Sequence, residues 1–287
     1  MVNNETAFLI TAFDQLREVK FTVKMLREIW KTTSQSPIVL VISGDTDRSI
    51  FFNDDDFTRV VHLDDMVGDK FRTLVSTSIM RQIEHGMLEI KDIEREYGPI
   101  KNIVHIHGDI LLLDEDGFFA QLNQWKLSNK PVAADNVGAQ NPVKKVIDGV
   151  EYNWRFFGCE LMPQLFAVDH DFCKHTGYMY DMTIIGEAEI KATEWALLGN
   201  LHRAVYEDGS GHALLPHIDP QNDKDSPYRC VFNELVHVVK HNRDQWGLHP
   251  HWGGFCHFGN SLHYTKEHRE SRNTMALSKY GIDLSNW

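Results

Sequence analysis

The sequence predicts an α/β fold in which a mostly parallel sheet is flanked by helices. Two patterns support this. Short apolar runs alternate with amphipathic helix patterns between residues 7 and 106, and several of these runs end in polar or glycine-containing turns. The chain has 287 residues, 42% of them hydrophobic, which is enough to bury a sizeable core. No internal repeat or linker interrupts it, so we expect a single compact domain.

The first two strands and the helix between them form a βαβ unit. Residues 7–12 are a short apolar run typical of a buried parallel strand. Apolar residues then recur at spacings of three and four, which predicts a helix, and Pro37 ends that pattern before a second buried strand at 38–42. Such a unit is nearly always right-handed. The helical positions are Leu16, Val19, Val23, Leu26 and Trp30.

The alternation continues through one more strand, helix and strand. Residues 59–63 are the third predicted strand, and an amphipathic stripe from Phe71 to Ile83 predicts the next helix. We expect Gly86 to close this helix as its C-terminal cap. Residues 102–106 form the fourth strand, which leads directly into His107-Gly108-Asp109.

Beyond residue 130 the pattern is less regular. We expect a short strand at 130–134, a loop at 136–142 and strand-like pieces around Phe156 and Phe166. A helix is predicted at 187–205, and the tail beyond Pro216 is expected to be irregular.

Composition disfavours several classes of function. No apolar run approaches the roughly 18 residues that span a bilayer, and the N-terminus lacks a secretory pattern, so we expect a cytoplasmic protein. The net charge of −12 disfavours a nucleic-acid partner, while it suits a divalent cation that neutralises substrate phosphates. The four cysteines are widely spaced and are expected to be reduced thiols: Cys159, Cys173, Cys230 and Cys256.

The strongest local signal is the polar triplet His107-Gly108-Asp109, which lies between two apolar stretches. Ligands of open α/β sheets bind at the carboxyl ends of the strands. A carboxylate there suits Mg²⁺ or Mn²⁺, an imidazole tolerates Mn²⁺ better than Mg²⁺, and Gly108 lets the backbone approach a phosphate. The alternative is that His107 and Asp109 only cap a turn.

This order of elements resembles the GT-A fold of nucleotide-sugar glycosyltransferases. Their hallmark is Asp-x-Asp at this place, which holds the metal and the sugar-nucleotide diphosphate. Here the triplet is His-Gly-Asp, so Asp109 carries over directly and His107 replaces the first aspartate. The resemblance implies one GT-A-like domain over 1–287, with a nucleotide-binding half (1–114) and an acceptor-binding half (115–287). It also implies Mn²⁺ or Mg²⁺, a UDP- or GDP-sugar donor, and a glycan or small-molecule acceptor.

The same resemblance assigns a nucleotide site to the ends of the first strands. The end of the first strand is where such enzymes hold the base and ribose, and Asp45 follows the second strand, where an acidic residue commonly contacts the base. Turn chemistry alone would also favour Asp at these places, and Lys70 would otherwise be a solvated side chain. The expected nucleotide-binding residues are Thr11, Ala12, Phe13, Asp14, Asp45, Lys70, His107 and Gly108.

A third metal ligand is suggested near the C-terminus. The segment around His257, in a short apolar strand before Phe258-Gly259, resembles the His-Phe-x-Gly element of glycogenin-like enzymes, whose histidine completes the metal site. The spacing to glycine is one residue short, and the lysine that usually follows is missing. The expected metal ligands are therefore Asp109, His107 and His257, with a core histidine as the alternative for His257.

Two carboxylates are candidates for the catalytic base. Glu194 falls on the apolar stripe of the predicted 187–205 helix, where a carboxylate is costly unless it has a partner or a task. Its segment resembles the acidic helix start of inverting GT-A enzymes; alternatively, Glu194 pairs with Lys191 at the helix edge. Asp135, after the 130–134 strand, is a second base or a sugar ligand.

Two other functions remain open at the level of sequence. A nucleotidyltransferase that makes the nucleotide-sugar would carry a glycine-rich basic loop after the first strand, and Phe13-Asp14-Gln15 has no glycine. A non-catalytic carbohydrate- or nucleotide-binding protein is compatible with His107 in place of aspartate. Walker A and dinucleotide-binding glycine motifs are missing from the sequence. The sequence leaves the oligomeric state undetermined and permits a homo-oligomer.

Overall fold

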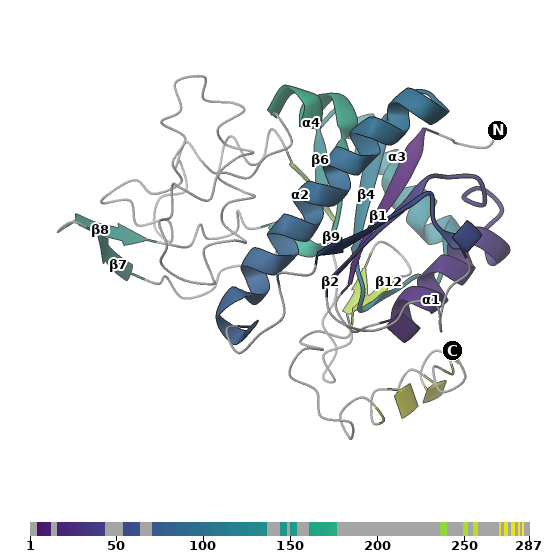
Figure 1. The fold of residues 1–287 in the computed structure, drawn as a ribbon, viewed down its shortest axis with the longest axis horizontal. Helices are drawn as coiled ribbons and strands as arrows, with labels where there is room; N and C mark the ends of the chain where they lie inside the picture. Colours follow the sequence, from purple (N-terminus) through teal and green to yellow (C-terminus); the bar gives the residue numbers. More distant parts are fainter. Residues whose placement is uncertain are drawn as a thin grey trace.

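The computed structural model describes residues 5–12, 16–43, 54–63, 71–136, 144–147, 150–153, 161–176, 236–239, 249–251, 255–257 and a few positions between 270 and 283. Its centre is a seven-stranded sheet in the order β10-β6-β9-β4-β1-β2-β3, in which β9 alone runs antiparallel to its neighbours (Figure 1). The strands are β1 (Thr6–Ala12), β2 (Ile38–Ser43), β3 (Arg59–Leu63), β4 (Asn102–His107), β6 (Val132–Asn136), β9 (Leu161–Asp169) and β10 (Val236–Val239).

Helices cover both faces of this sheet, and two small sheets lie outside it. The predicted α/β fold with a mostly parallel sheet is confirmed. The helical segments are α1 (Leu16–Lys24), its π-helical continuation η1 (Met25–Ile29), the short 3-10 helix η3 (Asp54–Asp56), α2 (Phe71–Tyr97), α3 (Glu115–Ser128) and α4 (His170–Thr176). The small sheets are β11-β12-β5, made of β11 (His249–His251), β12 (Phe255–His257) and β5 (Ile110–Leu111), and the hairpin of β7 (Lys144–Ile147) and β8 (Val150–Asn153).

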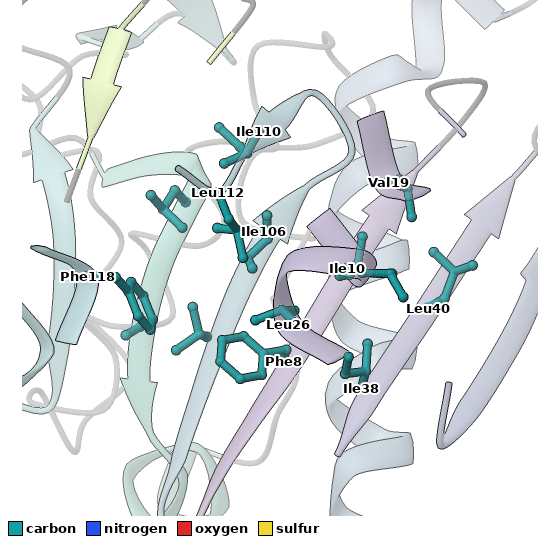
Figure 2. Packing of buried hydrophobic residues seen from close by; sticks show 14 of the residues in the cluster. Phe8, Ile10, Val19, Leu26, Ile38, Leu40, Ile106, Ile110, Leu112 and Phe118 are labelled. Carbon is teal, nitrogen blue, oxygen red and sulfur yellow. The ribbon is translucent and has the colours of Figure 1, made fainter. Parts of the chain in front are cut away.

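One face of the sheet carries the main apolar core. Phe8 and Ile10 of β1 pack there with Leu26 and with Phe118 of α3, and all four side chains are fully buried (Figure 2). Trp30 lies against Phe118, with ring centroids 5.4 Å apart. The stripe predicted for the first helix therefore faces the sheet as expected, and its last turn is π-helical rather than α-helical.

The opposite face is covered by α2, which lies across β1 and β2 (Figure 1). The prediction that Gly86 caps this helix is wrong: Gly86 lies inside α2, and Gly98, with φ of +98°, follows its last residue. A Cβ at Gly86 would lie 2.1 Å from Cδ1 of Leu9 and 3.0 Å from Cγ2 of Val41. Glycine is needed here for the close approach of helix and sheet.

The first four predicted strands are confirmed to within one residue at each end. The next strand lies two residues later than expected, because β6 includes Asn136, which the sequence had assigned to a loop. The tail beyond Pro216, expected to be irregular, contributes β10, β11 and β12. Phe156 and the predicted 187–205 helix lie outside the described residues. No helix in the described part of the chain has the length and apolar character to cross a membrane.

Candidate functional site

The carboxyl ends of β1, β2 and β4 lie side by side at the same end of the sheet, because these three strands are neighbours and parallel. This end is called the carboxyl edge below. Thr11 of β1 pairs with His107 of β4 in the strand register. Immediately after β4, the backbone N–H of Gly108 donates a hydrogen bond to the carbonyl oxygen of Thr11 at 2.7 Å. The His107-Gly108-Asp109 triplet is therefore held against the end of β1.

Within the triplet, His107 and Asp109 form a buried pair. Nδ1 of His107 lies 2.6 Å from Oδ1 of Asp109, and the two side chains are only 9% and 3% exposed. A buried carboxylate requires a hydrogen-bond donor, which makes Nδ1 the protonated ring nitrogen. In the neutral imidazole Nε2 is then an acceptor, which is the form in which histidine binds metals.

A strand from near the C-terminus lies beside the triplet. β12 pairs antiparallel with β5, so that His257 is opposite Ile110 and Cys256 is opposite Leu111. Thr22 of α1 donates its hydroxyl to the carbonyl oxygen of Ile110 at 2.9 Å, which fixes β5 against the helix. The fold thus brings the backbone of His257 opposite the residue that follows Asp109.

Two side chains of the triplet carry groups that can bind a cation. Asp109 offers a carboxylate and His107 an imidazole, a donor set that suits Mn²⁺ and, through the carboxylate, Mg²⁺. Among the side chains that the structure describes, no group of three His, Cys, Asp or Glu residues gathers to hold a metal ion. Nδ1 of His107 faces Asp109 and Nε2 lies on the far side of the ring, so one cation can contact the Asp109 carboxylate or Nε2 of His107, but not both in this arrangement. At either place the cation would complete its shell with other residues, with water or with substrate phosphate.

The last two residues of β1 are buried. The side chains of Thr11 and Ala12, both expected at the nucleotide site, are fully buried. The Thr11 hydroxyl lies 2.8 Å from Nε2 of His105, and the Gln82 side chain of α2 donates to the carbonyl oxygen of Ala12 at 2.9 Å. Neither His105 nor Gln82 is among the site residues predicted from the sequence. The available signal for His105 was a second histidine at alternate spacing within an apolar strand.

The remaining predicted site residues are only partly described. Asp135 lies in β6, where its backbone pairs with Val239 of β10. Because β6 and β4 both run antiparallel to β9, Asp135 is near the same edge of the sheet as the triplet. The residues that lie outside the described part are Phe13, Asp14, Asp45, Lys70 and Glu194.

A second polar cluster lies at the other end of the strands, near the amino end of β4. His170, fully buried at the start of α4, contacts the carbonyl oxygen of Ile100 through Nδ1 at 2.9 Å. Desolvation lowers the pKa of His170, and the hydrogen bond to Ile100 opposes this shift in part. Lys174 forms an ion pair with Glu94 at 2.9 Å close by. This cluster joins α4 to α2 and lies away from the triplet.

Comparisons with known proteins give a partial likeness to solved structures. The chain matches no protein-family model and no curated protein. A cytidylyltransferase from Leptospira borgpetersenii is similar over 61% of this chain and 64% of its own length, less than two thirds, with 10% identity and a TM-score of 0.35. The 4-diphosphocytidyl-2C-methyl-D-erythritol synthase from Anaerococcus prevotii is similar over 68% of this chain and 83% of its own, with 13% identity and a TM-score of 0.36.

Proposed function

We propose that this protein is a glycosyltransferase that moves a sugar from a UDP- or GDP-sugar to an acceptor hydroxyl with the help of a divalent cation. The observation that carries the proposal is the buried His107–Asp109 pair, 2.6 Å apart, at the carboxyl end of a central parallel strand. That edge is where open α/β sheets bind their ligands. A nearly buried carboxylate in this position is well suited to a cation and its phosphate ligands.

In this proposal, the carboxylate of Asp109 holds Mn²⁺ or Mg²⁺, with His257 as a further ligand from β12, and Nδ1 of His107 orients that carboxylate. His107 becomes a ligand itself only if its ring turns away from this hydrogen bond. When bound, the cation supplies Lewis-acid stabilisation of the negative charge on the leaving diphosphate. Gly108 has no Cβ, which lets a phosphate approach the backbone beside the pair. The base and ribose are assigned to the segments that follow β1 and β2, which contain Phe13, Asp14 and Asp45.

The acceptor is assigned to the β6 side of the same edge. In an inverting reaction Asp135 or Glu194 accepts the proton of the acceptor hydroxyl as the sugar carbon is attacked. In a retaining reaction the protein requires no dedicated base, and neither carboxylate has this role. The position of Asp135 in β6, near the edge that carries the triplet, supports it as the first candidate to test.

Nucleotidyl transfer is the second candidate, because a carboxylate after β4 would serve that reaction equally well. In both reactions a cation neutralises phosphate charge at the same place. The products separate the two: glycosyl transfer releases a nucleoside diphosphate, whereas nucleotidyl transfer consumes a nucleoside triphosphate and releases pyrophosphate. The segment after β1 lacks the glycine-rich loop that nucleotidyltransferases use, which favours glycosyl transfer.

The deciding experiment measures these products directly. The full chain is incubated with a panel of UDP- and GDP-sugars and, separately, with nucleoside triphosphates and sugar phosphates, each with Mn²⁺, with Mg²⁺ and with EDTA. Cation-dependent release of UDP or GDP that is lost in Asp109→Asn supports the proposal. Asp116→Asn is the matched control, because Asp116 is exposed on α3. Release of pyrophosphate alone would establish the second candidate, and no turnover together with nucleotide binding would indicate a binding protein.

A further inference from the structure

Polar side chains concentrate at one end of the otherwise apolar interface between α2 and the sheet. Towards the middle of β1 and β2 this interface is made by residues such as Leu9 and Val41, which lie next to Gly86 of α2. At the carboxyl end of β1 it contains Thr11 and Gln82 instead, with His105 of β4 beside Thr11, and all three residues are at most 2% exposed. Polar groups buried in this way lower stability unless they are hydrogen-bonded, so their placement calls for an explanation.

Three hydrogen bonds hold the last two residues of β1, two from β4 and the residue after it and one from α2. The Thr11 hydroxyl bonds to His105 of β4 at 2.8 Å, and the Gln82 amide of α2 donates to the carbonyl oxygen of Ala12 at 2.9 Å. The N–H of Gly108, in the triplet itself, donates to the carbonyl oxygen of Thr11 at 2.7 Å. The end of β1 is therefore tied both to the triplet and to the strand that precedes it.

His105 is itself held in place. Its ring lies against Phe166 of β9, with centroids 5.0 Å apart, and it precedes His107 by two positions in β4. Residues two apart in a strand point to the same face of the sheet. The bond from Thr11 to His105 thus links the strand that leads into the nucleotide segment to the strand that carries the His107–Asp109 pair.

We propose that Thr11 and His105 are positioning residues, whose buried hydrogen bond aligns the nucleotide-binding end of β1 with the His107–Asp109 pair. This inference rests on the proposed function, in which one donor molecule spans both places, with its base after β1 and its diphosphate at the triplet. The sequence predicted that Thr11 contacts the nucleotide directly. In this inference Thr11 acts through His105 instead, because its side chain is fully buried and hydrogen-bonded to His105. Misplacement by about 1 Å between two such places is enough to reduce a reaction rate a hundredfold.

The chain contains a matched control at the other end of the same two strands. Thr6 of β1 accepts a hydrogen bond from the Asn102 amide of β4 at 3.3 Å, and both side chains are at most 5% exposed. Thr6 and Thr11 are five residues apart in one strand, roughly 16 Å at the usual rise per residue. Replacing either threonine with valine removes one buried hydroxyl between β1 and β4, but only Thr11 adjoins the triplet.

The test measures nucleotide affinity and stability in parallel on the full chain. The probes are UDP and GDP with Mn²⁺, titrated calorimetrically into wild type, Thr11→Val and Thr6→Val, with thermal unfolding of each protein. We expect both variants to be destabilised. Thr11→Val should bind the nucleotide about five- to tenfold more weakly, and Thr6→Val should bind like wild type. Thr11→Ser, which keeps the hydroxyl, should restore the affinity.

The partner residue provides the second arm. His105→Leu should weaken nucleotide binding to a similar extent. Adding Thr11→Val to it should cause little further loss, because both substitutions remove the same hydrogen bond. Equal affinities of Thr11→Val and Thr6→Val would overturn the inference while leaving the proposed function intact. If wild type binds neither probe, the proposed function fails and the inference fails with it. Should Thr11→Val not fold, Thr11→Ala compared with Thr11→Ser gives the same contrast.

Discussion

His257 is paired with Ile110 across the β12–β5 ladder, so a residue near the C-terminus lies opposite the position that follows Asp109. Paired Cα atoms in an antiparallel ladder are about 4.5–5.5 Å apart. His249 pairs with His257 on the other side of β12. The triplet after β4 is therefore bordered by a strand that is separated from it by more than half of the sequence.

The first prediction concerns the role of His257 as a metal ligand. His257→Ala should weaken Mn²⁺-dependent nucleotide binding by about tenfold, because an imidazole donor is lost from the site. His251→Ala is the control, since His251 pairs with Phe255, two positions before His257 in β12. Calorimetric titration of Mn²⁺ and UDP or GDP measures both. Identical affinities of the two variants and wild type would remove His257 from the site.

The second prediction concerns Asp109. Asp109→Asn keeps the size of the side chain and removes its charge, so cation-dependent turnover should fall by on the order of a hundredfold. The fold should be retained, because an amide oxygen can still accept the hydrogen bond from His107. Circular dichroism and thermal unfolding check the fold, and product release checks the activity. Unchanged turnover in Asp109→Asn would show that the cation, if required, is held elsewhere.

The third prediction concerns the packing of α2 at Gly86. Gly86→Ala should destabilise the protein by about 1–3 kcal/mol, because the new Cβ meets the side chain of the fully buried Leu9, and this overpacking outweighs the gain in helix propensity. Urea unfolding of the variant measures the free energy of unfolding. Leu9→Val combined with Gly86→Ala shortens the facing side chain and should recover part of the loss. A more stable Gly86→Ala protein would contradict the close approach.

The fourth prediction concerns the pH dependence of stability and His170. Desolvation lowers the pKa of His170 in the folded protein, and its hydrogen bond to Ile100 opposes the shift in part. Well above about pH 6.5 histidine is neutral in both states, so the shift has no effect on stability there. As the pH falls below that value, the unfolded chain takes up a proton that the folded protein does not, and the free energy of unfolding decreases.

The test for His170 compares two substitutions. His170→Asn keeps an N–H donor near the Ile100 carbonyl and does not titrate, so its free energy of unfolding should fall less than that of wild type between pH 6.5 and 5. His237→Asn serves for comparison. The pKa of His237 in β10 is also lowered, by desolvation and by Lys130, but His237 is only half-buried, so its substitution should change the pH dependence of the free energy of unfolding less than His170→Asn does. Urea unfolding across this range measures both. Parallel curves for wild type and His170→Asn would contradict the assignment.

Much of the fold was predictable because the central strands are buried on both faces. Such strands appear as continuous apolar runs, and the predicted strands at 7–12, 38–42, 59–63 and 102–106 match β1, β2, β3 and β4 to within one residue at each end. The triplet was predictable for the same reason, because polar residues directly after a buried parallel strand must lie at the carboxyl edge of the sheet. Both inferences need only neighbouring residues.

The sequence by itself determined the α/β class, the central strands and the place of Asp109 at their carboxyl edge. The tertiary structure decided that Gly86 serves close packing rather than a helix end, that Thr11 is engaged with His105 across 94 positions, and that β12 pairs beside the triplet. The physical reason is the separation in sequence over which each kind of interaction acts. Hydrophobic periodicity and turn chemistry act among residues close in the chain, whereas a hydrogen bond or a steric contact between distant segments exists only once the sheet has assembled.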